Sequence, residues 1–133
     1  MTFSLGQHSL VKLAGVHPDL VKVVKDCIAH SPVDFAIVQG LRTPAQEALM
    51  VAIHASTTMH SRHLPNREGF ACAIDFAAFV DGGIVWDPIS LYHTIAAAMK
   101  DSAKQLGIPI EWGGDWATFK DYGHVQLGWI AYP

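Results

Sequence analysis

The segment ACAIDFAAFV at residues 71–80 places a single carboxylate, Asp75, inside an otherwise apolar stretch. This composition, followed by the turn residues Asp81, Gly82 and Gly83, predicts a buried strand. Side chains alternate between the two faces of a strand, so one face is bulky and the other surrounds Asp75 with small alanines. The bulky face consists of Cys72, Ile74, Phe76, Ala78 and Val80. Because burial of a lone carboxylate is unfavourable, Asp75 is expected to meet a cation or hydrogen-bond donors.

Helices are predicted where apolar residues recur at helical spacing, at 18–29, 43–54 and 87–107. Further strands are predicted at 33–40, 84–86, 108–112 and 124–129. Pro18 suits a first helical position, and Thr43 with Gln46 predicts a capping box. Asp87 is expected to cap the longest helix and Gly107 to end it. Helices that come first, followed by hairpin-like strands around a helix, predict an α+β fold with a small antiparallel sheet and packed helices.

The composition excludes several classes of protein. With 133 residues, 50% of them hydrophobic and 16% charged, the chain is expected to form one domain with a substantial core. A formal net charge of −3 argues against a nucleic-acid partner. Two cysteines without a C-x-x-C pattern argue against a disulfide scaffold or a cysteine-rich zinc site. No apolar run is long enough to span a bilayer, and no basic segment precedes an apolar one at the N-terminus. We therefore expect neither membrane insertion nor a signal peptide.

Eight histidines are many for a chain of this length, and they are not gathered in a tract. The candidates for a partner of Asp75 are His54, His60, His63, His93 and His124. His63, Asp75 and His124 would supply two imidazoles and one carboxylate, the donor set of an open zinc site with a fourth position for water. Asp121, three residues before His124, is expected to take a proton from that water and deliver it to a leaving amine. The same donor set also suits non-haem iron, and His60 competes with His63 as a ligand.

Three short motifs, S-R-H at 61–63, A-x-A-x-D at 71–75 and D-x-x-H at 121–124, resemble those of a known enzyme family. They are similar to motifs of the zinc peptidases of peptidoglycan, which include D-alanyl-D-alanine carboxypeptidases and the L-alanyl-D-glutamate endopeptidases of phages. The resemblance implies a hedgehog/D-Ala-D-Ala-peptidase-like fold. It covers most of the chain, and residues 1–133 are expected to form a single zinc peptidase domain without a separate cell-wall-binding domain. The chain departs from the family pattern between His63 and Asp75, which stand twelve positions apart and enclose a longer loop.

The resemblance also implies roles for individual residues. His63, Asp75 and His124 match the ligands of one Zn²⁺ per chain, and Asp121 matches the catalytic acid and base. Arg42, in the segment GLRT, matches the arginine that steadies the scissile carbonyl and its oxyanion.

Further substrate contacts are expected from four residues. Ser61 is expected to position the loop or the substrate by hydrogen bonds, and Arg42 and His60 to contact the substrate. Trp112, in the segment EWGGDW, either walls a cleft for the substrate or fills the edge of the core, and a place near the site is favoured.

Together these implications predict a zinc-dependent peptidoglycan endopeptidase, an endolysin that cuts the stem peptide between L-alanine and D-glutamate during host lysis. A D-alanyl-D-alanine carboxypeptidase and a non-catalytic zinc-containing binding module are the alternatives. The expected partner is the bacterial stem peptide, and the expected state is a monomer. The protein is expected to stay in the host cytoplasm until a phage pore protein releases it to the cell wall.

Overall fold

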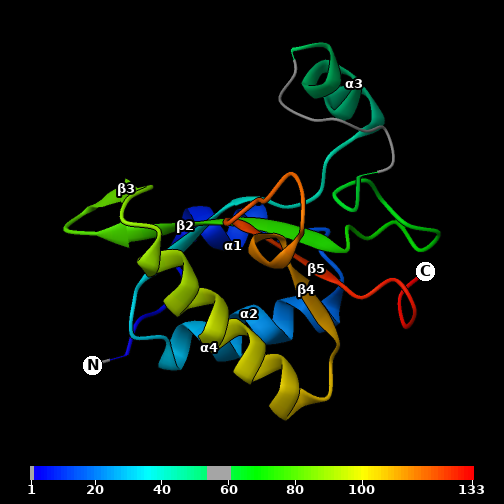
Figure 1. The fold of residues 1–133 in the computed structure, drawn as a ribbon. Helices are drawn as coiled ribbons and strands as arrows, with labels where there is room; N and C mark the ends of the chain where they lie inside the picture. The colour runs from blue at the N-terminus through cyan, green and yellow to red at the C-terminus, as the bar shows by residue number, and fades with distance from the viewer. Residues whose placement is uncertain (1, 54–60) are drawn as a thin grey trace.

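The computed structural model describes residues 2–53 and 61–133, and it places a five-stranded sheet above two long helices (Figure 1). In chain order the elements are α1 (Gln7–Lys12), α2 (Pro18–His30), β1 (Phe35–Gln39), α3 (Pro44–Ala52), β2 (Ala73–Val80), β3 (Gly83–Val85), α4 (Ser90–Leu106), β4 (Ile110–Trp112), the 3-10 helix η1 (Gly113–Asp115) and β5 (His124–Leu127). The predicted α+β class with a small antiparallel sheet is confirmed. Within the described ranges, no helix has both the length and the apolar character needed to cross a membrane.

Strand β2 is the centre of the sheet, whose order is β1-β2-β5-β4, and every pairing is antiparallel. One edge of β2 pairs with β1. Its other edge is divided, because residues 73–75 pair with β5 whereas residues 78–80 pair with β3. The change of partner falls at Phe76, whose amide donates to the Gly123 carbonyl at 2.7 Å. The segment that leads into β5 is thereby fixed to the middle of β2.

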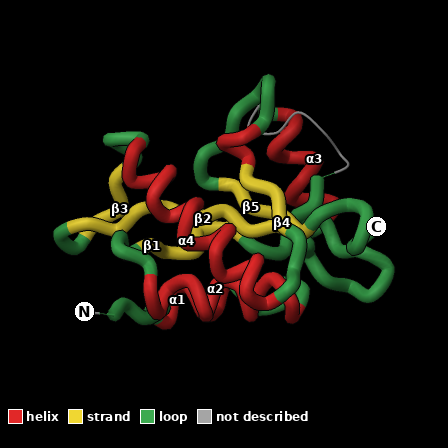
Figure 2. Tube along the Cα trace, turned by 60° about the horizontal axis from the view of Figure 1, so that its bottom comes forward, coloured by secondary structure: helices red, strands yellow, loops and turns green. Residues whose placement is uncertain are grey.

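The core lies between one face of this sheet and helices α2 and α4, which pack against each other below the sheet (Figures 1 and 2). Ile74, Phe76 and Val125 point into it and are fully buried. The two helices contribute Leu20, Val23, Val24, Cys27, Ile95 and Met99. Burial of each large apolar side chain contributes about 2 kcal/mol. Since side chains alternate along a strand, this core also fixes the face that Asp75 and His124 occupy, which is the opposite one.

The predicted starts of α2 and α3 and the predicted end of α4 are correct, whereas α3 ends at Ala52, before the predicted residue 54, which lies outside the described residues. Pro18 begins α2, and Thr43 forms the predicted capping box with Gln46 at the start of α3. Gly107 ends α4 in the left-handed conformation with φ 71°, which glycine adopts without steric cost.

The prediction that Asp87 caps α4 is wrong. The helix begins at Ser90, with Ile89 at the cap position and no side-chain cap. The residues in between form a turn, because Leu91 N donates to Pro88 O and Tyr92 N to Ile89 O, bonds that each span three residues. Regular α-helical bonding therefore starts later than the sequence pattern indicates. Several strands are also shorter than predicted, with β4 beginning at 110 and β5 ending at 127.

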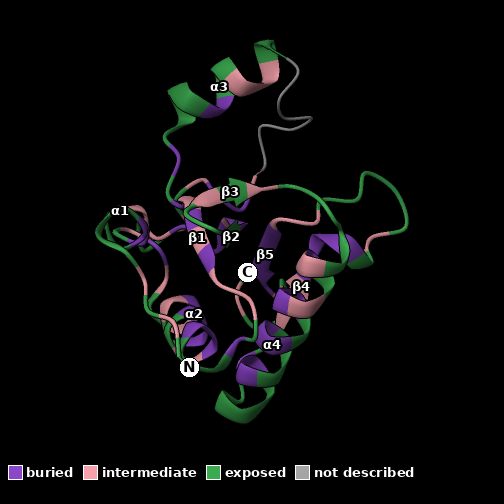
Figure 3. Cartoon of the chain, turned by 90° about the vertical axis from the view of Figure 1, so that its left-hand side faces the viewer, coloured by how far each residue is buried: buried purple, intermediate pink, exposed green. Residues whose placement is uncertain are grey.

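Two short elements, α1 and η1, lie outside the predictions because each has too few residues to show apolar periodicity. Helix α1 supports β1 through Ser9, whose Oγ accepts a hydrogen bond from Ile37 N at 3.0 Å. The chain passes close to α1 just after β1, since a Cβ at Gly40 would lie 2.1 Å from the Lys12 carbonyl oxygen. Helix α3 is mostly exposed and stands on the side of the sheet away from α2 and α4 (Figure 3).

Candidate metal centre

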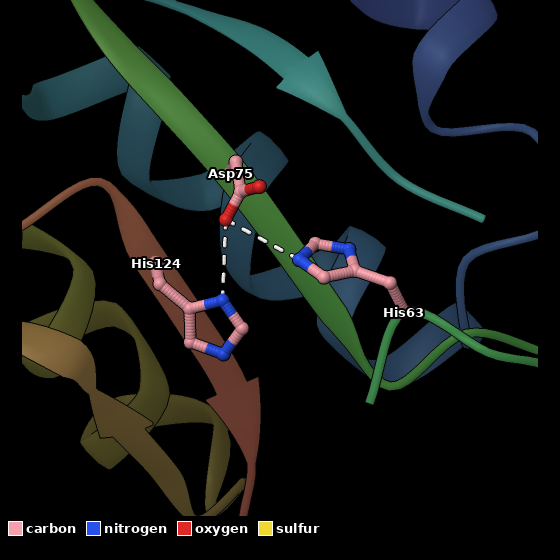
Figure 4. Close-up of side chains that lie close together, drawn as sticks. All are labelled: His63, Asp75 and His124. Carbon is pink, nitrogen blue, oxygen red and sulfur yellow. Dashed lines mark hydrogen bonds and ion pairs between the residues drawn. The ribbon is translucent and has the colours of Figure 1, made fainter. Parts of the chain in front are cut away.

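Three of the residues proposed as ligands meet on the face of the sheet opposite the core (Figure 4). Asp75 on β2 and His124 on β5 are direct cross-strand partners, so the register brings their side chains together. His63 reaches the same point from the loop before β2. Asp75 Oδ1 lies 3.3 Å from His63 Nε2 and 3.1 Å from His124 Nδ1, and the three ligand atoms all lie within 4.8 Å of one another. These residues therefore form a group that could hold a metal ion.

The long loop between His63 and Asp75 does not keep them apart, because it closes on itself. The side-chain oxygen of Asn66 accepts hydrogen bonds from the amides of Glu68 and Phe70 at 2.9 and 3.0 Å. The amide of Asn66 donates in turn to the Phe70 carbonyl at 2.8 Å. The additional residues thus form a separate turn, and the two ends of the loop remain in reach of the site.

The orientation of the His63 ring is set by its backbone surroundings. Nδ1 lies 2.9 Å from the Gly40 carbonyl oxygen, which can only accept, so Nδ1 carries the proton. Nε2 is then free of hydrogen and faces Asp75. Further bonds hold the loop, because His63 N donates to Ser61 Oγ at 3.1 Å and Arg42 N donates to His63 O at 2.8 Å. The buried His63 ring is thereby presented through its Nε2 atom.

A similar relay sets the ring of His124. Its Nε2 lies 2.8 Å from Oε1 of Gln126, two residues further along β5. Gln126 directs its amide nitrogen to Oε2 of Glu111 on β4 at 3.5 Å, and a carboxylate oxygen only accepts. The amide oxygen therefore faces His124, so Nε2 is the donor and Nδ1 faces Asp75 without hydrogen. Partners of this kind orient metal-binding imidazoles and make them more basic.

The arrangement fits a divalent cation better than any set of protein hydrogen bonds. Two hydrogen-free imidazole nitrogens and a carboxylate oxygen converge, and their lone pairs repel one another unless a cation or a proton lies between them. Without a metal, a proton takes the place of the cation. Burial alone would raise the pKa of Asp75, but hydrogen bonds and charges from His124 and His63 in their protonated forms hold that pKa well below its ordinary value. Burial lowers the pKa of His124, but the hydrogen bond and charge of Asp75 outweigh it and raise this pKa above the ordinary value. The set of two imidazoles and one carboxylate matches catalytic zinc sites.

Asp121 lies beside this group, in the segment that leads into β5. Its amide donates to the Gly113 carbonyl at 3.1 Å, and its carbonyl accepts from His124 N at 3.3 Å. Gly113 is required at this approach, since a Cβ there would lie 2.3 Å from the Asp121 carbonyl oxygen. Burial raises the pKa of Asp121, and the charge of Asp75 raises it further. A carboxyl group with a raised pKa is suited to accept and return a proton.

A cavity of about 350 Å³ opens next to the two carboxylates. Its lining includes Asp75 and Asp121 together with Trp86, Ile89 and Lys120. It lies where β2 changes its partner from β5 to β3 and extends over the turn before α4. Its volume is within the range of small ligand pockets.

Two of the remaining predicted site residues, Arg42 and Ser61, are hydrogen-bonded to His63. The backbone of Arg42 bonds to His63, and its buried guanidinium forms an ion pair with Glu47 of α3. Ser61 bonds to the His63 amide through its hydroxyl, so it lies in the metal-site loop. His60 lies outside the described residues. A direct contact of Arg42 or Ser61 with substrate remains a prediction.

Trp112 does not line the cavity beside Asp121. Its side chain is 4% exposed and belongs to the core, and its Nε1 donates to the Tyr122 carbonyl at 2.8 Å. The ring packs edge-on against His93 and Tyr122. A Cβ at Gly114 would lie 2.4 Å from the Trp112 ring, so the turn of η1 rests directly on it. Trp112 thus packs from the core side against the segment that contains Asp121 and holds it in place.

Sequence reasoning missed three residues of the site: Gln126, Glu111 and Gly40. Gln126 had a visible signal, because it stands two positions after His124 and therefore shares its face of the strand. Glu111 and Gly40 depend on which strands become neighbours, and no local pattern indicates this.

Comparison with known proteins places the chain among peptidoglycan enzymes. The family described as phage L-alanyl-D-glutamate peptidase matches residues 1–130. The L-alanyl-D-glutamate peptidase of Escherichia phage T5 is 36% identical over 96% of this chain and 99% of that protein. The peptidoglycan L-alanyl-D-glutamate endopeptidase CwlK of Bacillus subtilis (strain 168) is 30% identical over 78% of this chain and 66% of its own length. The crystal structure of the L-Ala D-Glu endopeptidase ChiX of Serratia marcescens superimposes with a TM-score of 0.87 at 38% identity, and it covers 100% of this chain and 94% of ChiX.

Proposed function

Because the chain belongs to the phage L-alanyl-D-glutamate peptidase family, we propose that it is a zinc-dependent endopeptidase that cuts peptidoglycan stem peptides between L-alanine and D-glutamate. It is a peptidase, as its relatives from phages and bacteria are. The observation that carries the zinc assignment is the convergence of His63, Asp75 and His124 through hydrogen-free ligand atoms beside Asp121. The fold similarity to ChiX supports the same activity.

In this proposal His63, Asp75 and His124 hold one zinc ion. When bound, zinc polarises the substrate carbonyl and lowers the pKa of a water molecule. The hydrogen bond from His63 to Gly40 and the hydrogen bond from His124 to Gln126 hold the two rings, so that their ligand atoms stay in place during the reaction. The Asp75 side chain is 26% exposed, so the group is open to solvent and substrate on one side.

Asp121 performs the proton transfers. It takes a proton from the attacking water as the new C–O bond forms at the alanyl carbonyl. It returns that proton to the nitrogen of D-glutamate as the C–N bond breaks, so the products are a carboxylic acid and an amine. General acid and base catalysis of this kind contributes about 10²- to 10⁴-fold to a rate. The raised pKa of Asp121 supports this role.

Arg42 is proposed to stabilise the negative charge that develops on the carbonyl oxygen. Its ion pair with Glu47 restricts the guanidinium to one orientation, and its backbone bond to His63 O keeps it next to the metal site. Ser61 is proposed to act through the loop, since its hydroxyl accepts from the His63 amide. His60 and Trp112 are proposed to assist substrate binding, Trp112 by supporting the segment of Asp121.

For the biological setting, we propose a monomer that is made in the host cytoplasm and reaches the cell wall through a phage pore protein. The family assignment supports the cell wall as the place of action.

The test is a digestion of purified peptidoglycan by the zinc-loaded protein, with a chelator-treated sample as control. Released fragments are identified by mass spectrometry after new amino termini are labelled. The expected result is new D-glutamate amines that disappear with chelator. Release of D-alanine alone would indicate a carboxypeptidase. A folded, zinc-loaded protein without any metal-dependent product from several wall types would indicate a binding module.

A further inference from the structure

The lining of the cavity beside Asp121 includes an exposed apolar rim, Trp86 and Ile89, and a cation, Lys120, that the proposed chemistry does not yet use. Trp86 is 60% exposed and Ile89 42% exposed, and both line the cavity. The Trp86 ring stacks on buried Tyr92 with centroids 6.1 Å apart and planes inclined by 12°. Tyr92 is itself fixed, because its hydroxyl donates to Val85 O at 2.8 Å and accepts from Ala78 N at 3.1 Å. The rim is therefore a rigid apolar wall at the surface.

Lys120 is the only cationic side chain among the described residues that line the cavity. Its Nζ donates to the Gly114 carbonyl at 3.1 Å, which directs the ammonium group toward the η1 turn. An ammonium group has three hydrogens, so two remain for a ligand. The other charged residues of the lining are Asp75 and Asp121. An anionic ligand would be repelled by these carboxylates, and Lys120 is positioned to offset that repulsion.

The side on which the leaving amine departs indicates which part of the substrate lies in this cavity. This inference rests on the proposed function. Asp121 delivers a proton to the leaving amine, so the residue that supplies this amine lies on the Asp121 side of the metal group. Asp121 and Lys120 are sequence neighbours and line the same cavity. The leaving residue is D-glutamate, which has two carboxyl groups. Only one of them continues the peptide, so the other is present as a free carboxylate or, where the wall is amidated, as a carboxamide.

We propose that this cavity is the subsite for the D-glutamyl residue, in which Lys120 binds the free carboxylate while Trp86 and Ile89 cover the aliphatic chain. The site would therefore distinguish a stem peptide with a free D-glutamyl carboxylate from one whose carboxyl group is amidated. Hydrogen bonds to a charged partner are about twice as strong as neutral ones. The loss of one such bond typically lowers affinity or kcat/KM by about tenfold or more.

The experiment compares two synthetic peptides that contain the L-alanyl-D-glutamyl bond and differ only in a carboxylate or carboxamide at the free position of D-glutamate. Zinc-loaded wild-type protein and the Lys120→Met variant are measured on both peptides. We expect wild-type kcat/KM to be about tenfold higher for the carboxylate peptide. Lys120→Met should lose about tenfold on that peptide and little on the carboxamide peptide, so the preference disappears. Lys120→Arg should keep it.

Lys104→Met, at an exposed position in the last turn of α4, is the charge-matched control and should behave as wild type. Equal losses on both peptides in Lys120→Met, or a preference that survives the substitution, would overturn the subsite. Calorimetry with the product that begins with D-glutamate separates this failure from failure of the proposed function. If Lys120→Met weakens binding of this product, the subsite is supported even without cleavage. If wild type and Lys120→Met bind the product equally, the subsite is contradicted.

Discussion

Asp75 and His124 stand directly opposite each other on antiparallel strands, and Asp75 Oδ1 lies 3.1 Å from His124 Nδ1 as a result. This pair of candidate metal ligands is therefore a property of the strand register rather than of a flexible loop. A shift of β5 by one residue would turn Val125 toward the metal group and His124 into the core. Such a shift is opposed by the burial of Val125 and Leu127, so the apolar core and the metal site require the same register.

Removal of the proposed proton-transfer group should separate metal binding from catalysis. We expect Asp121→Asn to bind zinc with unchanged stoichiometry and to lose about 10²- to 10⁴-fold in kcat. Zinc content by elemental analysis and cleavage of a stem peptide provide the measurement. Asp101→Asn, on the exposed side of α4, is the control and should keep full activity. An Asp121→Asn variant with wild-type activity would contradict the proposed mechanism.

Gln126 should matter although it does not touch the metal. Substitution by methionine removes the acceptor that holds His124 Nε2 and leaves the ring free to turn. We expect zinc affinity to fall by roughly 10- to 100-fold in Gln126→Met. Titration against a competing chelator measures this change. Gln105→Met, which loses only an exposed bond to Asp101 on α4, should bind zinc as the wild type does.

The stability of the metal-free protein should depend on pH, and zinc should stabilise the protein most where the contribution of Asp75 and His124 is lost at high pH. The depressed pKa of Asp75 contributes stability above its unfolded pKa of about 3.9, and this stability is lost as the pH falls through the folded value. The raised pKa of His124 contributes stability below about pH 6.5, and this stability is lost as the pH rises through the folded value.

In chelator-treated protein, Asp75 and His124 should therefore contribute most to the free energy of unfolding between about pH 4 and pH 6.5. Zinc competes with the proton at His124, so the increase in Tm caused by zinc should grow as the pH rises from 5 to 8. Thermal unfolding at a series of pH values, with and without zinc, measures both trends. A zinc effect that is constant over this range would show that the ion does not bind at His124.

The approach of the η1 turn to Asp121 should not tolerate a larger residue. In Gly113→Ala the new Cβ would lie 2.3 Å from the Asp121 carbonyl oxygen, so one of the two segments has to move. We expect a loss of about 1–3 kcal/mol in the free energy of unfolding. We also expect a fall in kcat with zinc retained. Gly83→Ala is the matched control, because a Cβ there meets nothing within 4 Å. Urea denaturation and peptide cleavage test both variants.

The sequence predicts those parts of the site that depend on local alternation. Apolar residues on one face of β2 identify the face of Asp75, and the same rule applied to β5 would have identified Gln126 together with His124. The capping box of α3 and the glycine at the end of α4 are also local signals, and both are present.

The parts that sequence reasoning could not supply depend on how distant segments meet. Glu111, through Gln126, and Gly40 fix the two imidazoles from other strands or loops. The cavity with Lys120 exists because β2 changes partners at Phe76. The start of α4 was misplaced because a three-residue turn precedes it, and such turns have no strong apolar pattern.

The self-contained turn held by Asn66 has a consequence for variation within this architecture. Its internal bonds join Asn66 to Glu68 and Phe70, and they do not involve the side chains of His63, Asp75 and His124. We therefore expect that the number of residues between His63 and Asp75 can grow or shrink without moving these two side chains relative to each other. This turn is a natural place to insert an affinity tag, a fluorophore or a targeting peptide while the chemistry of the protein is left intact.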